Sequence, residues 1–147
     1  MRACIEARMV REVMTTAPVT VKPTTGLQEL KRLFETHDYN AFPVVDEHGG
    51  LRGVVTKLDL LRLFRPERFR WIPDFRVPGG TSVDDVMTRN IVAIEPADSV
   101  VTAADRMIEY GVRSLPVVEQ RADAPRLVGI VSRRDLLGCL HLDDDAA

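Results

Sequence analysis

The sequence predicts an α+β fold built from two tandem βαββα repeats, each a small three-stranded sheet with two helices. The main observation is that the sequence pattern of Gly53–Asp59 is repeated in Gly129–Asp135. In both stretches a short apolar strand leads into a helix, with a hydroxyl residue at the junction and an acid three residues later. One repeat is too small to bury a good core alone, so we expect the two to pack together around a pseudo-two-fold axis.

The duplication extends well beyond these two junctions. Adding 73 to the residue number takes Val13-Met14-Thr15 to Val86-Met87-Thr88, and Pro43-Val44-Val45 to Pro116-Val117-Val118. After a longer hairpin loop in the second copy, adding 76 takes Asp59 to Asp135. A shared order of motifs at a nearly constant offset indicates an internal repeat.

Hydrophobic periodicity predicts the same elements in each copy. In the first copy, Val19–Val21 is predicted to be a strand, and Leu27, Leu30, Leu33 and Phe34 share one face of a helix that begins after Gly26. Phe42–Val45 and Leu51–Val55 are two strands joined by a turn, which predicts an antiparallel hairpin. A second helix begins at about Lys57. Residues 1–12 show only a weak helical pattern.

These elements place the first repeat at residues 8–64, a linker at 65–80 and the second repeat at 81–141, together forming one module. The linker interleaves arginines with Phe69, Trp71 and Phe75, and prolines break any long helix. It is interpreted as a connector whose aromatic residues pack on the module or at a dimer contact. The alternative is a basic, aromatic lip over an anionic ligand.

Composition argues against several classes of function. The 20 basic and 22 acidic residues give a net charge of −2, so overall charge favours neither nucleic-acid nor membrane binding. No apolar run approaches the roughly 20 residues of a membrane span. Cys4 and Cys139 have no CxxC spacing and the three histidines no metal-ligand spacing, so we expect a reduced cytoplasmic protein without a metal site.

The ordered set of motifs resembles the cystathionine-β-synthase (CBS) domain. The set comprises Val-Met-Thr, a Val-x-x-x-Pro segment, an amphipathic helix, Pro-Val-Val and the glycine-to-aspartate stretch, and it occurs twice between about residues 8 and 140. Two such domains in tandem resemble a Bateman module, and with no effector domain attached the chain resembles the stand-alone pairs. The resemblance implies two pseudo-symmetric clefts between the repeats that bind adenosyl ligands, and regulation of a partner protein.

The resemblance also implies roles for individual residues. Asp59 and Asp135 would accept hydrogen bonds from the ribose hydroxyls, while Thr56 and Ser132 would contact phosphate. Adenine would lie against the first strand and the residues before Pro-Val-Val. Arg113, whose counterpart in the first repeat is Asn40, occupies a position where some relatives place a basic residue that binds phosphate. The implied site residues are Val19, Thr20, Val21, Asn40, Ala41, Phe42, Pro43, Thr56, Lys57 and Asp59 in the first repeat, and Val92, Ala93, Ile94, Arg113, Ser114, Leu115, Pro116, Ser132, Arg133 and Asp135 in the second.

A purely structural interpretation of the junctions stays open. Thr56-x-x-Asp59 and Ser132-x-x-Asp135 also fit a helix capping box with Asp in place of the usual Glu. However, Lys57 and Arg133 lie in a first helical turn, where positive charge opposes the helix dipole. That conflict favours an anionic ligand beside at least one junction.

Two functions therefore compete. The first is an adenine-nucleotide sensor that binds AMP, ADP, ATP or S-adenosylmethionine as a regulatory ligand, with no cofactor required. The second is a ligand-free scaffold that forms a homodimer through helix faces and docks an unknown client protein, with Phe64, Trp71 and Leu140 at the interface. An enzyme is not expected, because the sequence offers no nucleophile–base pair, metal cluster or Walker-type loop.

Overall fold

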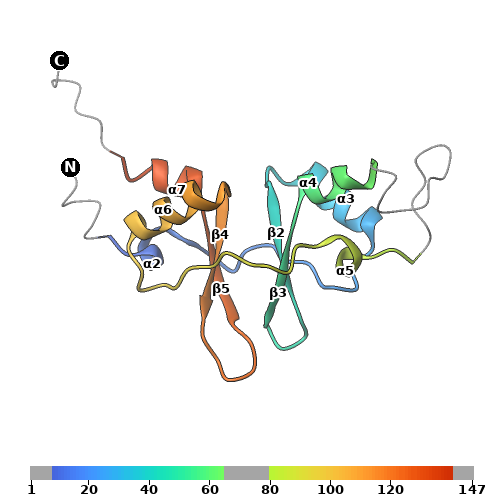
Figure 1. The fold of residues 1–147 in the computed structure, drawn as a ribbon, viewed down its shortest axis with the longest axis horizontal. Coiled ribbons are helices and arrows are strands. Elements are labelled where there is room, and N and C mark those ends of the chain that lie inside the picture. Colours follow the sequence, from blue (N-terminus) through green and yellow to red (C-terminus); the bar gives the residue numbers. More distant parts are fainter. Residues whose placement is uncertain (1–7, 65–79, 141–147) are drawn as a thin grey trace, which may run out of the picture. The chain divides into compact units, whose positions relative to one another are not determined.

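The computed structural model describes residues 8–64 and 80–140, and it confirms the predicted α+β class (Figure 1). The chain divides into two compact units. The central unit is formed by residues 19–91, and the terminal unit by residues up to 18 together with those from 92 onwards. Apart from Gly80, the predicted linker, including Trp71, lies outside the described residues.

The central unit is built on the predicted hairpin, in which β2 (Ala41–Val45) pairs antiparallel with β3 (Leu51–Thr56). Its helices are α3 (Leu27–Thr36), α4 (Lys57–Leu61), the 3₁₀ helix η1 (Arg62–Phe64) and α5 (Val83–Val86). The side chains that form its core come from both the hairpin and the helices. They are Val21, Leu30, Phe42, Val44, Val55, Val83 and Val86.

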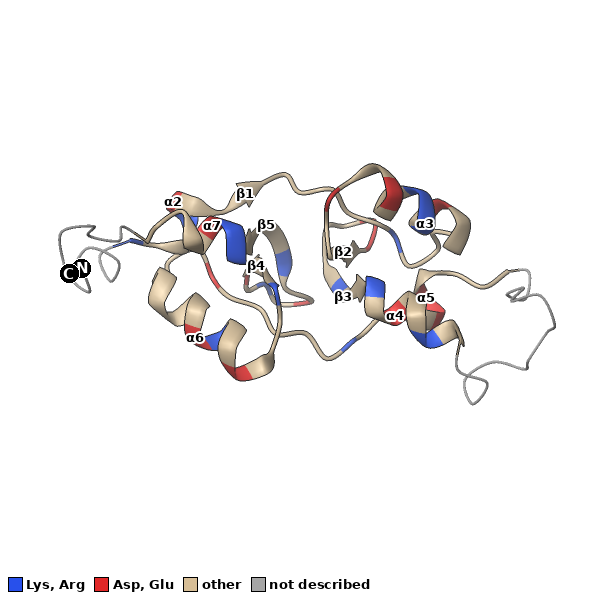
Figure 2. Cartoon of the chain, turned by 90° about the horizontal axis from the view of Figure 1, so that it is seen from above, with Lys and Arg blue, Asp and Glu red and all other residues tan. Residues whose placement is uncertain are grey.

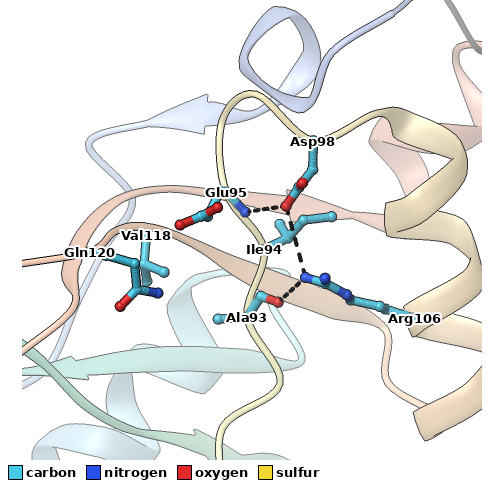
Figure 3. Close-up of a pocket in the computed structure, with 7 residues that line it drawn as sticks. All are labelled: Ala93, Ile94, Glu95, Asp98, Arg106, Val118 and Gln120. Atoms are coloured by element: carbon cyan, nitrogen blue, oxygen red, sulfur yellow. Dashed lines mark hydrogen bonds and ion pairs between the residues drawn. The ribbon is translucent and has the colours of Figure 1, made fainter.

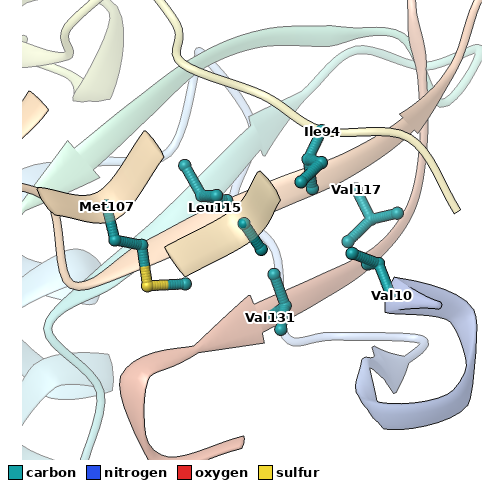
Figure 4. Close-up of a cluster of buried hydrophobic side chains, with 7 residues drawn as sticks. Val10, Ile94, Met107, Leu115, Val117 and Val131 are labelled. Carbon is teal, nitrogen blue, oxygen red and sulfur yellow. The ribbon is translucent and has the colours of Figure 1, made fainter. Parts of the chain in front are cut away.

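The terminal unit repeats this plan with a three-stranded sheet in the order β1-β5-β4. Its strands are β1 (Thr15–Thr16), β4 (Ser114–Glu119) and β5 (Arg126–Ser132). Its helices are α2 (Val10–Val13), α6 (Val100–Tyr110) and α7 (Arg133–Leu137). Figure 4 shows side chains from α2, α6 and the sheet meeting in its core, which consists of Val10, Ile94, Ala103, Met107, Leu115, Val117 and Val131.

The helix predicted after Gly26 is confirmed as α3, and its sequence explains why it lies where it does. Leu30 is buried in the core of the central unit, and Leu27, Leu33 and Phe34 pack against that core. The charged residues form exposed pairs along the helix, Lys31 with Glu35 and Arg32 with Glu29. Figure 2 shows that α3 carries residues of both charges. Such exposed pairs contribute little stability, so the apolar face holds the helix in place.

The predicted first strand of each repeat is much shorter than expected. Val21 forms a single parallel bridge to Val44, and Ile94 forms the equivalent bridge to Val117. The opposite edge of each hairpin is instead covered by a Val-Met-Thr segment from the other sequence repeat. Thr15 and Thr16 pair with β5, whereas Thr88 bridges to Val54 of β3 through backbone hydrogen bonds of 2.9 Å in both directions.

Candidate functional site

The two strand-to-helix junctions have the same local structure, a reciprocal capping box. The Thr56 Oγ1 accepts a hydrogen bond from the Asp59 N–H at 3.1 Å, and Asp59 Oδ2 accepts one from the Thr56 N–H at 2.8 Å. The Ser132 and Asp135 pair repeats both bonds at 3.2 and 2.8 Å. The structural interpretation of these motifs is therefore confirmed in both copies.

In each capping box the hydroxyl of the Thr or Ser also donates a hydrogen bond to the carboxylate of the Asp. Thr56 Oγ1 donates to Asp59 Oδ2 at 3.1 Å, and Ser132 Oγ donates to Asp135 Oδ2 at 3.0 Å. A hydroxyl has only one proton to donate. To contact a phosphate oxygen, either hydroxyl would have to rotate away from its own carboxylate.

The remaining carboxylate oxygen differs between the two junctions. Oδ1 of Asp59 accepts hydrogen bonds from Arg62 Nη1 at 2.7 Å and from Thr88 Oγ1 at 3.2 Å, and the residue is only 1% exposed. Oδ1 of Asp135 accepts no hydrogen bond from the residues that the structure describes, and Asp135 is half-buried. Of the two junction carboxylates, only that of Asp135 thus presents an oxygen without a donor from the described residues.

Basic residues lie beside the second junction. The Arg133 N–H donates to the Arg113 carbonyl at 3.0 Å, and the Lys57 N–H donates in the same way to the Asn40 carbonyl at 3.2 Å. The structure therefore places Arg133 next to Arg113 at the second junction and Lys57 next to Asn40 at the first. Because Arg113 and Arg133 are both exposed arginines, the second junction has two positive side chains where the first has one.

Several residues expected to line an adenine slot belong to the cores instead. Val21 and Phe42 are buried in the central unit, and Ile94 and Leu115 are buried in the terminal unit. Pro43 and Pro116 are buried as well. The expected slot residues with exposed surface directly precede these core residues along the chain. They are Val19, Thr20, Ala41, Val92, Ala93 and Ser114.

A shallow pocket of about 290 Å³ lies in the terminal unit next to the expected adenine strand (Figure 3). Arg106 of α6 donates from Nη1 to the Ala93 carbonyl at 2.6 Å and lies 3.9 Å from Asp98 Oδ2. The pocket is lined by Ala93, Ile94, Glu95, Asp98, Arg106, Val118 and Gln120.

Sequence reasoning missed Arg106. The available signal was the repeat itself, because its counterpart in the first repeat is Leu33, which packs against the central core. An arginine at a position where the other copy has a core leucine indicates a local difference between the two repeats.

Within residues 8–64 and 80–140, no group of three or more His, Cys, Asp or Glu side chains is arranged to hold a metal ion. No helix in the same ranges has the length and apolar character needed to cross a bilayer.

Comparison with known families identifies the chain. The model of the CBS domain matches residues 10–66 and 83–142. The chain therefore belongs to the CBS domain family and carries a pair of these domains, as the sequence motifs predicted.

Relatives of known sequence include short and long proteins. The CBS domain-containing protein YhcV of Bacillus subtilis is 36% identical over 128 residues, which cover 86% of this chain and 81% of YhcV. L-aspartate semialdehyde sulfurtransferase of Methanocaldococcus jannaschii is 27% identical over 128 residues, covering 87% of this chain. The chain spans only 22% of the length of that enzyme.

Solved structures with the same fold include complexes with adenosine compounds. CBSX2 in complex with AMP is 30% identical and superposes with a TM-score of 0.73 over 90% of this chain and 95% of CBSX2. The CBS domain pair of protein MJ0100, in complex with 5′-methylthioadenosine and S-adenosyl-L-methionine, is 26% identical. Its TM-score is 0.72 over 89% of this chain and 94% of that pair.

Proposed function

We propose that the chain is a regulatory module that binds an adenosyl ligand (AMP, ADP, ATP or S-adenosylmethionine) and thereby modulates a partner protein. The observation that carries the proposal is the Asp135 carboxylate, whose Oδ1 receives no hydrogen bond from the described residues. A carboxylate oxygen in that state is suited to accept hydrogen bonds from ribose hydroxyls. In this proposal the ligand regulates the module, and none of its residues is assigned a catalytic role.

The surroundings of Asp135 agree with a negatively charged ligand. Arg133 follows Ser132 directly, in the first turn of α7, where a positive side chain gains nothing from the helix dipole. The backbone hydrogen bond between Arg133 and Arg113 holds a second arginine next to it. Two arginines in the segments that form the second junction, together with an open carboxylate oxygen, match a ligand that carries ribose hydroxyls and a phosphate group, as AMP, ADP and ATP do.

Two related CBS pairs support the choice of ligand class, since CBSX2 was solved with AMP and the MJ0100 pair with two adenosine compounds. For this chain, the first experiment is a thermal-shift screen with AMP, ADP, ATP and S-adenosylmethionine. A ligand that binds only the folded state at 100 times its Kd adds about 2.7 kcal/mol of stability, which raises the melting temperature measurably.

The substitution Asp135→Asn tests the ribose assignment. It keeps the shape of the side chain and removes the charge, so we expect the affinity to fall about tenfold or more, because a hydrogen bond to a charged group contributes roughly 1.5–3 kcal/mol. Isothermal titration calorimetry measures the change. Asp105→Asn is the matched control, since Asp105 is an exposed acid on α6 of the same unit. Unchanged affinity in Asp135→Asn would refute the role of Asp135.

A second candidate function, a homodimeric interaction scaffold without a ligand, is favoured by a separate observation. Short helices in both units expose large apolar side chains, which monomeric proteins tend to scatter rather than group. They are Leu58, Leu61 and Phe64 on α4 and η1 of the central unit and Leu137 on α7 of the terminal unit, and Leu140 lies just after α7. The absence of any thermal shift at millimolar ligand, together with a stable dimer, would support the scaffold over the sensor.

A further inference from the structure

The two junction carboxylates have the same motif but different surroundings, and the difference lies in two positions. Three residues after Asp59 the chain has Arg62, whereas three residues after Asp135 it has Gly138. The hydroxyl of Thr88 reaches Asp59, whereas Thr15, its counterpart in the repeat, is not hydrogen-bonded to Asp135. Both additional donors therefore act on the first junction alone.

Both carboxylate oxygens of Asp59 already accept two hydrogen bonds each from the protein. Oδ2 accepts from the N–H and hydroxyl of Thr56, while Oδ1 accepts from Arg62 and Thr88. The bond from Arg62 is also a salt bridge of 2.7 Å to a carboxylate that is 1% exposed. Charge-assisted bonds to buried carboxylates are the strong ones, and a ribose would have to replace both donors on Oδ1 to bind there.

The backbone of Thr88 is held in place. Its N–H and carbonyl are both hydrogen-bonded to Val54 of β3 at 2.9 Å. The preceding Val83 and Val86 of α5 are buried in the core of the central unit. Moving the segment would break backbone bonds and expose core side chains, so a ligand could displace Thr88 from Asp59 only by rotating its hydroxyl away, at the loss of that hydrogen bond.

Gly138 leaves the second junction without such a donor. It ends α7 with helical backbone angles of φ −62° and ψ −20°, which any residue adopts. A side chain there would meet only ordinary contacts, since a Cβ would lie 3.4 Å from the Asp135 carbonyl and 3.6 Å from the Arg134 carbonyl. The backbone thus permits an arginine at this position, and the sequence has none.

We infer that Arg62 and Thr88 close the first repeat to adenosyl ligands, so that each chain binds one ligand, through the second repeat. Arg62 occupies the carboxylate oxygen that the ribose hydroxyls would need, and the Asp59–Arg62–Thr88 cluster acts as a structural tie between α4, η1 and the segment after α5. The inference rests on the proposed function, because it concerns where that ligand binds.

The test exchanges the two positions between the repeats. Gly138→Arg is expected to supply Asp135 with the donor that Asp59 has, and to lower affinity for AMP or S-adenosylmethionine about tenfold, the effect of one charge-assisted bond. Gly138→Met, which adds an unbranched side chain without a hydrogen-bond donor, should keep the wild-type affinity. Melting temperatures report whether either variant is misfolded. In the reverse exchange, Arg62→Gly combined with Thr88→Ala removes both donors to Asp59 Oδ1, and this double variant should raise the stoichiometry measured by calorimetry from one ligand per chain towards two.

Each outcome distinguishes the two claims. Two ligands per wild-type chain would overturn this inference and leave the proposed function intact. A stoichiometry of one in the folded double variant, or full affinity in Gly138→Arg, would overturn the role of these donors. Absence of binding in both wild type and the double variant would overturn the proposed function and this inference with it.

Discussion

Glycine is the only residue that fits at positions 53 and 129, because another segment of backbone passes directly over each of them. A Cβ on Gly53 would lie 2.7 Å from the Thr88 carbonyl oxygen, and one on Gly129 would lie 2.8 Å from that of Thr15. Real Cβ atoms do not approach a backbone oxygen this closely. The glycine of the repeated motif therefore exists to admit the Val-Met-Thr segment that completes each unit.

Gly53→Ala is accordingly expected to destabilise the protein by about 1–3 kcal/mol, the usual cost of forcing extra volume into a packed site. The midpoint of urea denaturation measures the loss. Gly26→Ala is the matched control, because Gly26 has extended backbone angles and a Cβ there would meet nothing within 4 Å. Equal midpoints for the two variants would show that the crossing segment can shift to accept a methyl group.

Single residues also mark the limit of what the sequence motif predicts about the candidate site. The motif identified Asp59 and Asp135 as equivalents, and the structure confirms that both complete a capping box. What distinguishes them, the donors to Oδ1, depends on Thr88, which lies 29 residues from Asp59. A contact at that separation follows from the fold and not from the local motif. The difference between Arg62 and Gly138 was visible in the repeat and is the signal that sequence reasoning passed over.

At the scale of elements, the turn between β2 and β3 is closed by one carboxylate. Asp46 Oδ1 accepts hydrogen bonds from the N–H groups of His48 and Gly50, each at 2.9 Å, and Oδ2 accepts one from Arg52 at 2.9 Å. The backbone bonds from Gly50 and His48, followed by the charge of Arg52, lower the pKa of Asp46 below its ordinary value of 3.8.

A lowered pKa in the folded state predicts a pH-dependent contribution to stability. The ionised form of Asp46 stabilises the fold above pH 3.8, and this stabilisation is lost as the pH falls through the lower pKa of the folded state. Asp46→Asn removes the charge, so its melting temperature should be below that of wild type at neutral pH. The two should converge as the medium is acidified. Glu47→Gln, which removes an exposed charge from the same turn, should match wild type throughout. A constant gap between wild type and Asp46→Asn would contradict the assignment.

Most helices and strands were predicted from local sequence, and the shortest ones were not. The apolar face of α3, both hairpins and the helix beginning at Lys57 follow from local sequence. The helices α2 and α5 have only four residues each, too few for a period to be recognised. Val19–Val21 was predicted as a strand from its β-branched residues. In the structure only Val21 of this segment pairs with the edge of the hairpin, through its bridge to Val44.

At the scale of the whole molecule, the two compact units do not coincide with the two sequence repeats. Each unit completes its sheet or bridge with the Val-Met-Thr segment that the sequence assigns to the other repeat, β1 in the terminal unit and Thr88 in the central unit. Sequence comparison of the repeats cannot reveal this exchange, because the two segments are alike and either would suit either hairpin. Because of this exchange, each compact unit contains segments from both sequence repeats.

The proposed homodimer is the last feature at this scale, and it makes a direct prediction. Leu61 of α4 and Leu137 of α7 are 58% and 64% exposed, so Leu61→Asp and Leu137→Asp place charges on the proposed interface without disturbing either core. We expect both variants to sediment as monomers of 16.5 kDa in analytical ultracentrifugation, because burying an unpaired carboxylate opposes association. Ile108→Asp is the control: Ile108 is 80% exposed on α6, outside the proposed interface, and should leave the dimer intact. A dimer that survives both leucine substitutions, or dissociates with Ile108→Asp, would place the interface elsewhere.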